Sequence, residues 1–179
     1  ESGKWLAAYR TLQDLAPRLP HTSLVSIGDR EADLFELFVL AQDPQSPRLL
    51  VRANRGRQRQ VMTDQQLTPW WEHMSGLAVA GRLALALPRC GSHAARTAEL
   101  DLRYGPVTLK PPQGLQDGPL ALWAVYLREA APPAGVEGVE WLLLTNVPTT
   151  DLEAVRERVR WYGARWGIDG TGYVYLDTQ

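Results

Sequence analysis

The chain has 179 residues, of which 45% are hydrophobic and 22% charged, and its formal net charge is −1. This length is enough for one good-sized core, or for one domain that carries an insertion. The near-zero charge excludes a chain that is basic throughout, so any contact with a polyanion must come from local clustering. The single cysteine, Cys90, excludes an internal disulfide framework and a cysteine-based zinc site.

The sequence predicts neither a membrane span nor an export signal. No apolar run approaches the roughly 18–20 residues that cross a bilayer. The N-terminal residues Glu1-Ser2-Gly3-Lys4 lack the basic segment and apolar core of a signal peptide. The single cysteine suits a reducing cytoplasm. Because the chain starts without Met, we expect it to be a piece of something longer.

The first fifty residues alternate between predicted helices and strands. Apolar residues at helical spacing predict a helix over residues 5–15, which Pro17 and Pro20 end. A short apolar run predicts a strand at residues 24–28, followed by a helix at 31–41 and a second buried strand at 49–51. This alternation indicates an α/β protein.

The middle of the chain predicts an antiparallel β unit. Apolar or alternating segments are separated by glycines and prolines, which mark turns, and they cover residues 77–87, 98–104, 107–109 and 120–127. A short helix is predicted over residues 63–74, with Thr63 or Asp64 as its cap. Residues 130–138, with Pro132 and Pro133, are predicted to form a loop.

The last part returns to the α/β pattern, with a strand predicted at residues 141–145. A helix follows, and Thr150 and Glu153 are spaced as a capping box at its start. Its apolar stripe continues to about residue 168. Asp169-Gly170-Thr171-Gly172 comes next, and glycines at this density do not favour a helix.

Asp29 is the best single candidate for a functional residue. It follows a predicted buried strand, and ligands of open α/β sheets gather beyond the carboxyl ends of the strands. A carboxylate there could hold Mg²⁺ or Mn²⁺, provided that the fold brings a second carboxylate close. The alternative interpretation is a helix N-cap, in which Asp29 accepts hydrogen bonds from free backbone N–H groups.

Three further sets of residues could bind phosphates or bases. Tyr162, Arg165 and Asp169 share one helix face, where they could cradle a phosphate or form a surface ion pair beside a core tyrosine. Polar side chains interleave an arginine run that suits phosphate contacts or a solvated surface: Arg52, Arg55, Arg57 and Arg59. Among the seven tryptophans, most belong in the core, but a partly exposed one could stack on an extruded base; the set includes Trp70, Trp71, Trp141, Trp161 and Trp166.

Several of these segments together resemble one protein family. Gly28-Asp29-Arg30-Glu31-Ala32-Asp33 resembles the "DREAD" segment of bacterial cut-and-paste DDE transposases of the insertion-sequence-four, Tn-five-like family. Other segments of that family recur in the same order and at similar spacing over roughly residues 1–168: Glu1-Ser2-Gly3-Lys4-Trp5, Leu50-Val51-Arg52, Pro132-Pro133, Trp141-Leu142-Leu143-Leu144-Thr145 and Tyr162-Gly163-Ala164-Arg165-Trp166.

The resemblance implies an RNase H-like catalytic core, incomplete at its N-terminus, with a mainly antiparallel β insertion. Residues 1–53 would form the first part of the core and residues 54–138 the insertion. Residues 139–168 would supply the last strand and the catalytic helix, and residues 169–179 a divergent tail. The resemblance also implies a nucleoid-associated protein of the bacterial cytoplasm.

The family's chemistry uses two divalent metal ions, Mg²⁺ or Mn²⁺, held by three carboxylates during phosphodiester cleavage and strand transfer. Asp29 matches the second acid of that triad, and Asp169 stands where the third is expected. Tyr162 and Arg165 match residues that contact DNA phosphates near the cut, and Trp141 matches one that stacks on a flipped base. Arg52 matches an arginine beside the active site. The implied partners are double-stranded transposon-end DNA and a second copy of the chain.

The chain also departs from the family pattern. The resemblance places the first acid upstream of the sequence, and Asp169 is one methylene shorter than the expected glutamate. Leu176 stands where the resemblance to the family calls for a lysine. We therefore expect a truncated or frame-shifted transposase that alone neither cleaves nor transfers DNA. Two alternatives are a non-catalytic DNA-binding or regulatory remnant and a decayed product without a role.

Overall fold

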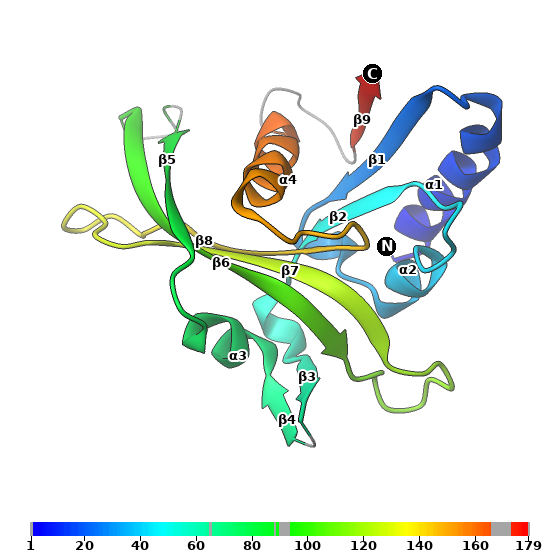
Figure 1. The fold of residues 1–179 in the computed structure, drawn as a ribbon, viewed down its shortest axis with the longest axis horizontal. Coiled ribbons are helices and arrows are strands. Elements are labelled where there is room, and N and C mark those ends of the chain that lie inside the picture. Colours follow the sequence, from blue (N-terminus) through cyan, green and yellow to red (C-terminus); the bar gives the residue numbers. More distant parts are fainter. Residues whose placement is uncertain (1, 65, 88, 90–93, 166–172, 179) are drawn as a thin grey trace.

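The computed structural model describes residues 2–64, 66–87, 89, 94–165 and 173–178. It is a mixed α/β structure built on one open, mainly antiparallel sheet with helices on both faces (Figure 1). The α/β class expected from the sequence is confirmed at this level. No helix in the described part of the chain is long and apolar enough to cross a membrane.

The sheet runs in the order β4-β3-β6-β7-β8-β2-β1-β9, and β5 pairs with the first half of β6, from Arg96 to Leu102. Its strands are β1 (Thr22–Gly28), β2 (Arg48–Arg52), β3 (Gln60–Thr63), β4 (Gln66–Pro69), β5 (Gly81–Leu87), β6 (Arg96–Leu109), β7 (Leu120–Glu129), β8 (Glu140–Thr145) and β9 (Tyr173–Thr178). Among the pairings of these described strands, β1 with β2 is parallel and the others are antiparallel.

Side chains of the sheet alternate between two cores, as the two-residue period of a strand requires. One core lies under three helices, α1 (Ser2–Leu15), α2 (Phe35–Leu40) and α3 (Trp70–Gly76), and includes Leu142 and Leu144 of β8. The other lies under α4 (Leu152–Ala164) and includes Trp141 and Leu143 of the same strand. A side chain's place along a strand therefore decides which helix it meets.

The strands predicted within residues 54–138 belong to the same sheet as β1 and β2. β8 connects the two sets of strands, because it pairs with β7 on one side and with β2 on the other. The predicted segments 98–104 and 107–109 form one strand, β6, which pairs with β7 from Leu100 to Leu109. The division into a core and an insertion stays a prediction.

Two predicted helices differ from the structure. The helix expected at residues 31–41 is split into a 3-10 turn, η2 (Arg30–Ala32), and α2, with Asp33 and Leu34 between them. The helix expected at residues 63–74 begins only at Trp70, because β3 and β4 form a hairpin that pairs Gln60 with Pro69. In that hairpin Val61 points into a core.

The start of α4 also differs by one residue from the capping-box prediction. The Asp151 carboxylate accepts a hydrogen bond from the Ala154 backbone N–H at 2.8 Å, and the helix begins at Leu152. Asp151 is therefore the N-cap instead of Thr150. Asp is among the strongest N-cap residues, so either position was chemically suitable and the backbone conformation decided between them.

Candidate functional site

Several predicted site residues within the described part of the chain lie at one edge of the sheet, where β1 and β2 end and β8 begins. The parallel register places Gly28 beside Val51, so Asp29 and Arg52 leave the sheet at the same edge. β8 runs in the opposite direction and pairs Leu143 with Arg52, which brings the start of β8 to this edge as well. The C-terminal end of α4 lies over the face of the sheet whose core includes Trp141 and Leu143.

Asp29 is both a cap and one half of an ion pair. Its Oδ1 accepts a hydrogen bond from the Glu31 backbone N–H at 2.9 Å, which caps η2. Its Oδ2 accepts one from Arg165 Nη2 at 2.7 Å, across 136 positions of sequence. The pair is partly buried, with side-chain exposures of 30% for Asp29 and 19% for Arg165. The N-cap interpretation is thus confirmed, and a long-range contact accompanies it.

Gly28 lets the chain turn tightly before Asp29. A Cβ at this position would lie 2.3 Å from the Ala32 Cβ, which is far inside van der Waals contact. The glycine therefore allows η2 to fold back against the end of β1. This packing fixes where the Asp29 carboxylate leaves the sheet.

Trp141, Tyr162 and Arg52 form a second group of contacts beside the ion pair. The rings of Trp141 and Tyr162 meet edge to face, with their centroids 5.0 Å apart. The Arg52 guanidinium lies 5.9 Å from the Trp141 ring centroid and donates a hydrogen bond to the Glu140 carbonyl at 3.4 Å. Trp141 is only 6% exposed, so its ring is covered rather than presented at the surface.

Tyr162 is fully buried, yet its hydroxyl has no hydrogen-bond partner among the described residues. A buried hydroxyl without a partner is costly, and its position one helical turn before Arg165 places this unused donor close to the ion pair. The prediction that Tyr162 is a core residue is confirmed.

The arginine run does not act as one surface. Arg55 is exposed, pairs with Glu140 Oε2 at 2.8 Å and lies over the Trp71 ring at 4.7 Å. Arg57 is exposed at the end of the 3-10 turn η3 (Arg55–Arg57). Arg59 is buried against Asp33, so the solvated-surface interpretation is wrong for this residue.

Sequence reasoning missed the role of Asp33, which it named only as part of the segment that carries the resemblance. Asp33 is fully buried and accepts hydrogen bonds from Arg59 Nε at 2.9 Å and from the Asn54 backbone N–H at 2.7 Å. Burial raises the pKa of the Asp33 carboxyl, while the Arg59 guanidinium and the Asn54 N–H oppose that shift. The sequence feature that could have indicated burial of Asp33 is the apolar pair Leu34-Phe35 directly after it, because both residues lie in the core.

The described residues do not by themselves form the expected metal site. No group of three or more His, Cys, Asp or Glu side chains among them is placed to hold a metal ion. Asp29 supplies one carboxylate there, and each of its oxygens already accepts a hydrogen bond. Asp169 and Trp166, which the sequence singled out, lie outside the described residues.

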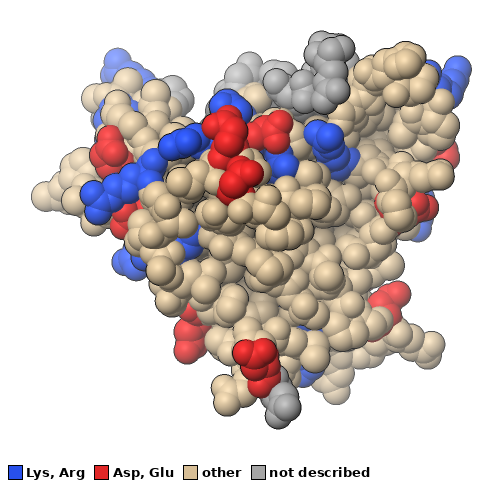
Figure 2. Space-filling model, viewed as in Figure 1, with Lys and Arg blue, Asp and Glu red and all other residues tan. Residues whose placement is uncertain are grey.

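Charges around α4 alternate in sign. In the view of Figure 2, basic and acidic side chains lie next to each other in this region, and much of the remaining face is uncharged. Glu153 pairs with Arg160 at 3.0 Å, and Glu157 pairs with Arg158. A polyanion at this face would therefore depend on a few placed arginines rather than on a broad basic surface.

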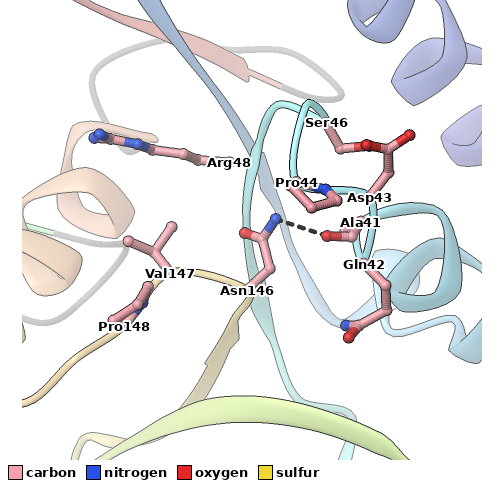
Figure 3. A pocket seen from close by; sticks show the side chains of 9 residues that line it. All are labelled: Ala41, Gln42, Asp43, Pro44, Ser46, Arg48, Asn146, Val147 and Pro148. Atoms are coloured by element: carbon pink, nitrogen blue, oxygen red, sulfur yellow. Dashed lines mark hydrogen bonds between the residues drawn. The ribbon is translucent and has the colours of Figure 1, made fainter.

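A separate pocket of about 300 Å³ lies at the other end of β2 (Figure 3). Asn146 joins its two sides, because its Nδ2 donates to the Ala41 carbonyl at 2.9 Å and its Oδ1 accepts from the Leu49 N–H at 2.8 Å. Its lining includes none of the predicted site residues and consists of Ala41, Gln42, Asp43, Pro44, Ser46, Arg48, Asn146, Val147 and Pro148.

No model of a known protein family matches the chain. The fold and the site define a mixed α/β protein in which one acid, two arginines and two aromatic residues lie together at one edge of the sheet. These residues are Asp29, Arg52, Arg165, Trp141 and Tyr162.

Proposed function

We propose that this chain is part of a DDE transposase of the insertion-sequence-four family, and that the edge around Asp29 contacts DNA phosphates. The contact between Asp29 and Arg165 carries the proposal, because these residues come from two segments of the resemblance that lie 136 positions apart. Residues in one active site must meet in space, and a chance resemblance in short segments gives no reason for that meeting.

The arrangement of the sheet supports the same proposal. The parallel pair β1–β2, the antiparallel neighbour β8 and the crossing helix α4 are compatible with the RNase H-like core that the resemblance implies. Asp29 stands at a carboxyl end of that parallel pair, where open α/β sheets place their ligands.

Arg165 and Arg52 would be the groups that bind DNA. A guanidinium can recognise phosphate through a fork of N–H donors, and Arg165 already donates one hydrogen bond, from Nη2, to the Asp29 carboxylate. A phosphate would compete with Asp29 for the same donor. The buried Tyr162 hydroxyl offers a further donor beside it.

Base stacking on Trp141 requires a rearrangement. Trp141 is covered by Tyr162 and Arg52, so its ring becomes accessible only when these contacts open. Binding of phosphates by Arg52 would remove one of the groups that cover the ring.

A second candidate function is DNA binding without turnover, as in a modulator of a complete transposase. The pairing of Asp29 with Arg165 favours it, because a metal ion at this carboxylate would have to lie beside a positively charged guanidinium, which repels it. Both candidates predict that the 179-residue chain binds DNA. An assay of metal-dependent DNA cleavage tests whether the chain is also an active enzyme.

The test is fluorescence anisotropy with a labelled DNA duplex over a range of salt concentrations. Each lost phosphate contact lowers the slope of log K against log salt by about one. We expect that loss for Arg165→Ala and for Arg52→Ala, and no loss for Arg82→Ala. Arg82 is the matched control, since its exposed side chain pairs with Asp101 on the β5–β6 arm, outside the site.

A variant of Asp29 should change DNA binding in the opposite direction. Asp29→Asn keeps an acceptor for the Glu31 N–H but removes the charge that holds Arg165, so we expect tighter DNA binding. Unchanged or weaker binding would contradict competition between the carboxylate and phosphate.

Incubation of supercoiled plasmid with the chain and Mg²⁺ or Mn²⁺ tests turnover. We expect no nicking, because Asp169 is one methylene shorter than the glutamate that the resemblance calls for. Metal-dependent nicking that Asp29→Asn abolishes would refute DNA binding without turnover. It would remain compatible with the proposal that the chain is part of a transposase.

A further inference from the structure

Asp33 and Arg59 form a buried ion pair between the two loops that carry the proposed site. Arg59 Nη2 lies 2.8 Å from Asp33 Oδ1, and the side chains are 6% and 0% exposed. Arg59 Nη2 also donates to the Asp33 carbonyl at 2.9 Å. The guanidinium thus binds both the side chain and the backbone of the same residue.

The pair joins the loop after β1 to the loop after β2. Asp33 Oδ2 accepts the Asn54 backbone N–H at 2.7 Å, and Asn54 Nδ2 reaches back to the Arg30 carbonyl at 3.4 Å. The Asn54 side-chain oxygen accepts from the Gly56 N–H at 3.0 Å, which caps η3. This set of bonds runs from the Asp29 turn to the turn that carries Arg55 and Arg57.

Arg59 is also fixed on its other side. Its carbonyl accepts the Trp70 N–H at 3.2 Å, at the start of α3, and its guanidinium lies 6.0 Å from the Phe35 ring centroid. Its position therefore depends on α3 and α2, both of which pack on the sheet. The pair transmits that position to the two loops.

We propose that Asp33 and Arg59 are positioning residues, which hold the acidic turn at Asp29 and the basic turn at Arg55 in fixed relation across the end of β1 and β2. The inference deepens the proposed function and rests on it, since these turns would flank the bound phosphates. Neither Asp33 nor Arg59 touches the DNA in this account, because both are buried.

The alternative is that the pair only stabilises the core. An ion pair is a poor choice for that role, because its desolvation offsets most of its attraction and an apolar pair of similar size is often as stable. The partners also argue against it. Besides one another, the two side chains bind the backbone of Asp33 and Asn54, which are the loop positions that set the turns.

The test compares the wild-type chain with the double variant Asp33→Leu/Arg59→Met, which replaces the pair by apolar side chains. Hydrogen exchange of the Asn54 amide and the side-chain Nε–H resonance of Arg165 report the positions of the two turns by NMR. We expect at least about tenfold faster exchange at Asn54, a shifted Arg165 resonance and a several-fold loss of duplex affinity, with the circular dichroism spectrum retained.

Two controls separate positioning from stability. Arg59→Lys keeps the charge but loses the fork geometry, so it should give an intermediate effect and guards against a double variant that does not fold. Val107→Ala lowers the stability of the same core at a position on β6, outside the two loops, and should leave all three readouts unchanged.

The inference fails if the folded double variant, or Arg59→Lys, keeps slow exchange at Asn54 and the wild-type Arg165 resonance. If the wild-type chain does not bind duplex DNA at low salt, the proposed function fails and the positioning of the phosphate-binding turns fails with it. In that outcome the exchange data still decide whether the pair holds the two loops together.

Discussion

Substitution of Gly28 by alanine tests how tightly the turn before Asp29 is packed. The added Cβ would lie 2.3 Å from the Ala32 Cβ, whereas its next neighbours, on Trp5 and Val51, would be at 3.6 Å, an ordinary contact distance. Over-packing of this kind costs about 1–3 kcal/mol of unfolding free energy. The cost should arise almost wholly from Ala32.

Removal of the clashing methyl should therefore rescue the variant. Ala32→Gly alone loses about 0.8 kcal/mol for the buried methyl group and about 0.5–1 kcal/mol for the freedom of glycine. In the Gly28→Ala/Ala32→Gly protein the new Cβ meets only ordinary contacts, so adding it to the Ala32→Gly background should cost close to nothing. The predicted coupling between the two sites is about 1–3 kcal/mol, of rescuing sign.

Urea unfolding of the four proteins, followed by circular dichroism and fluorescence, measures this coupling. Coincident transitions by the two probes would justify a two-state treatment. If Gly28→Ala costs the same with alanine or glycine at position 32, the close contact between the end of β1 and η2 is refuted.

Two further predictions concern the helix cap and a buried phenol. Asp151→Ala should lower the unfolding free energy by about 1 kcal/mol, while Thr150→Ala should change it little; a larger effect at Thr150 would restore the capping-box prediction. Burial and a 2.6 Å hydrogen bond to Glu140 raise the pKa of Tyr126 to about 12. Because the folded state holds this proton more tightly, the contribution of Tyr126 is complete below pH of about 10, the unfolded value, and declines as pH rises through about 12. Tyr126→Phe should remove one high-titrating phenol from the absorbance titration and flatten the stability profile in that window, and an unchanged titration would contradict the assignment.

The strands around the site were predictable from sequence because they are buried on both faces. Residues 24–28, 49–51 and 141–145 are short apolar runs, and each forms a strand, in β1, β2 and β8 respectively. The stripe of α4 was equally clear, since Val155, Val159 and Tyr162 all lie in one core. Strong local patterns and tertiary packing agree in these elements.

The hairpin and the buried ion pair could not be predicted, for different reasons. The segment 60–69 is short and mostly polar, and its pairing with β6 through Val61 and Leu109 is a long-range contact without a local pattern. Asp33 and Arg59 look like surface residues by type, and only the fold reveals that they are partners. The contact of Asp29 with Arg165 could not be predicted from local spacing, which relates Arg165 only to its own helix. The resemblance implied only that both residues belong to one active site.

The most direct test of the proposed DNA site is NMR mapping of the labelled chain during titration with a DNA duplex. We expect shifts to concentrate at the Arg52 and Arg165 side chains, the Trp141 indole and the Asp29 turn, and we expect Arg165 to move from its carboxylate-bound position. Shifts confined to the β5–β6 arm or to the pocket at Arg48, or no shifts at low salt, would contradict the proposed DNA site.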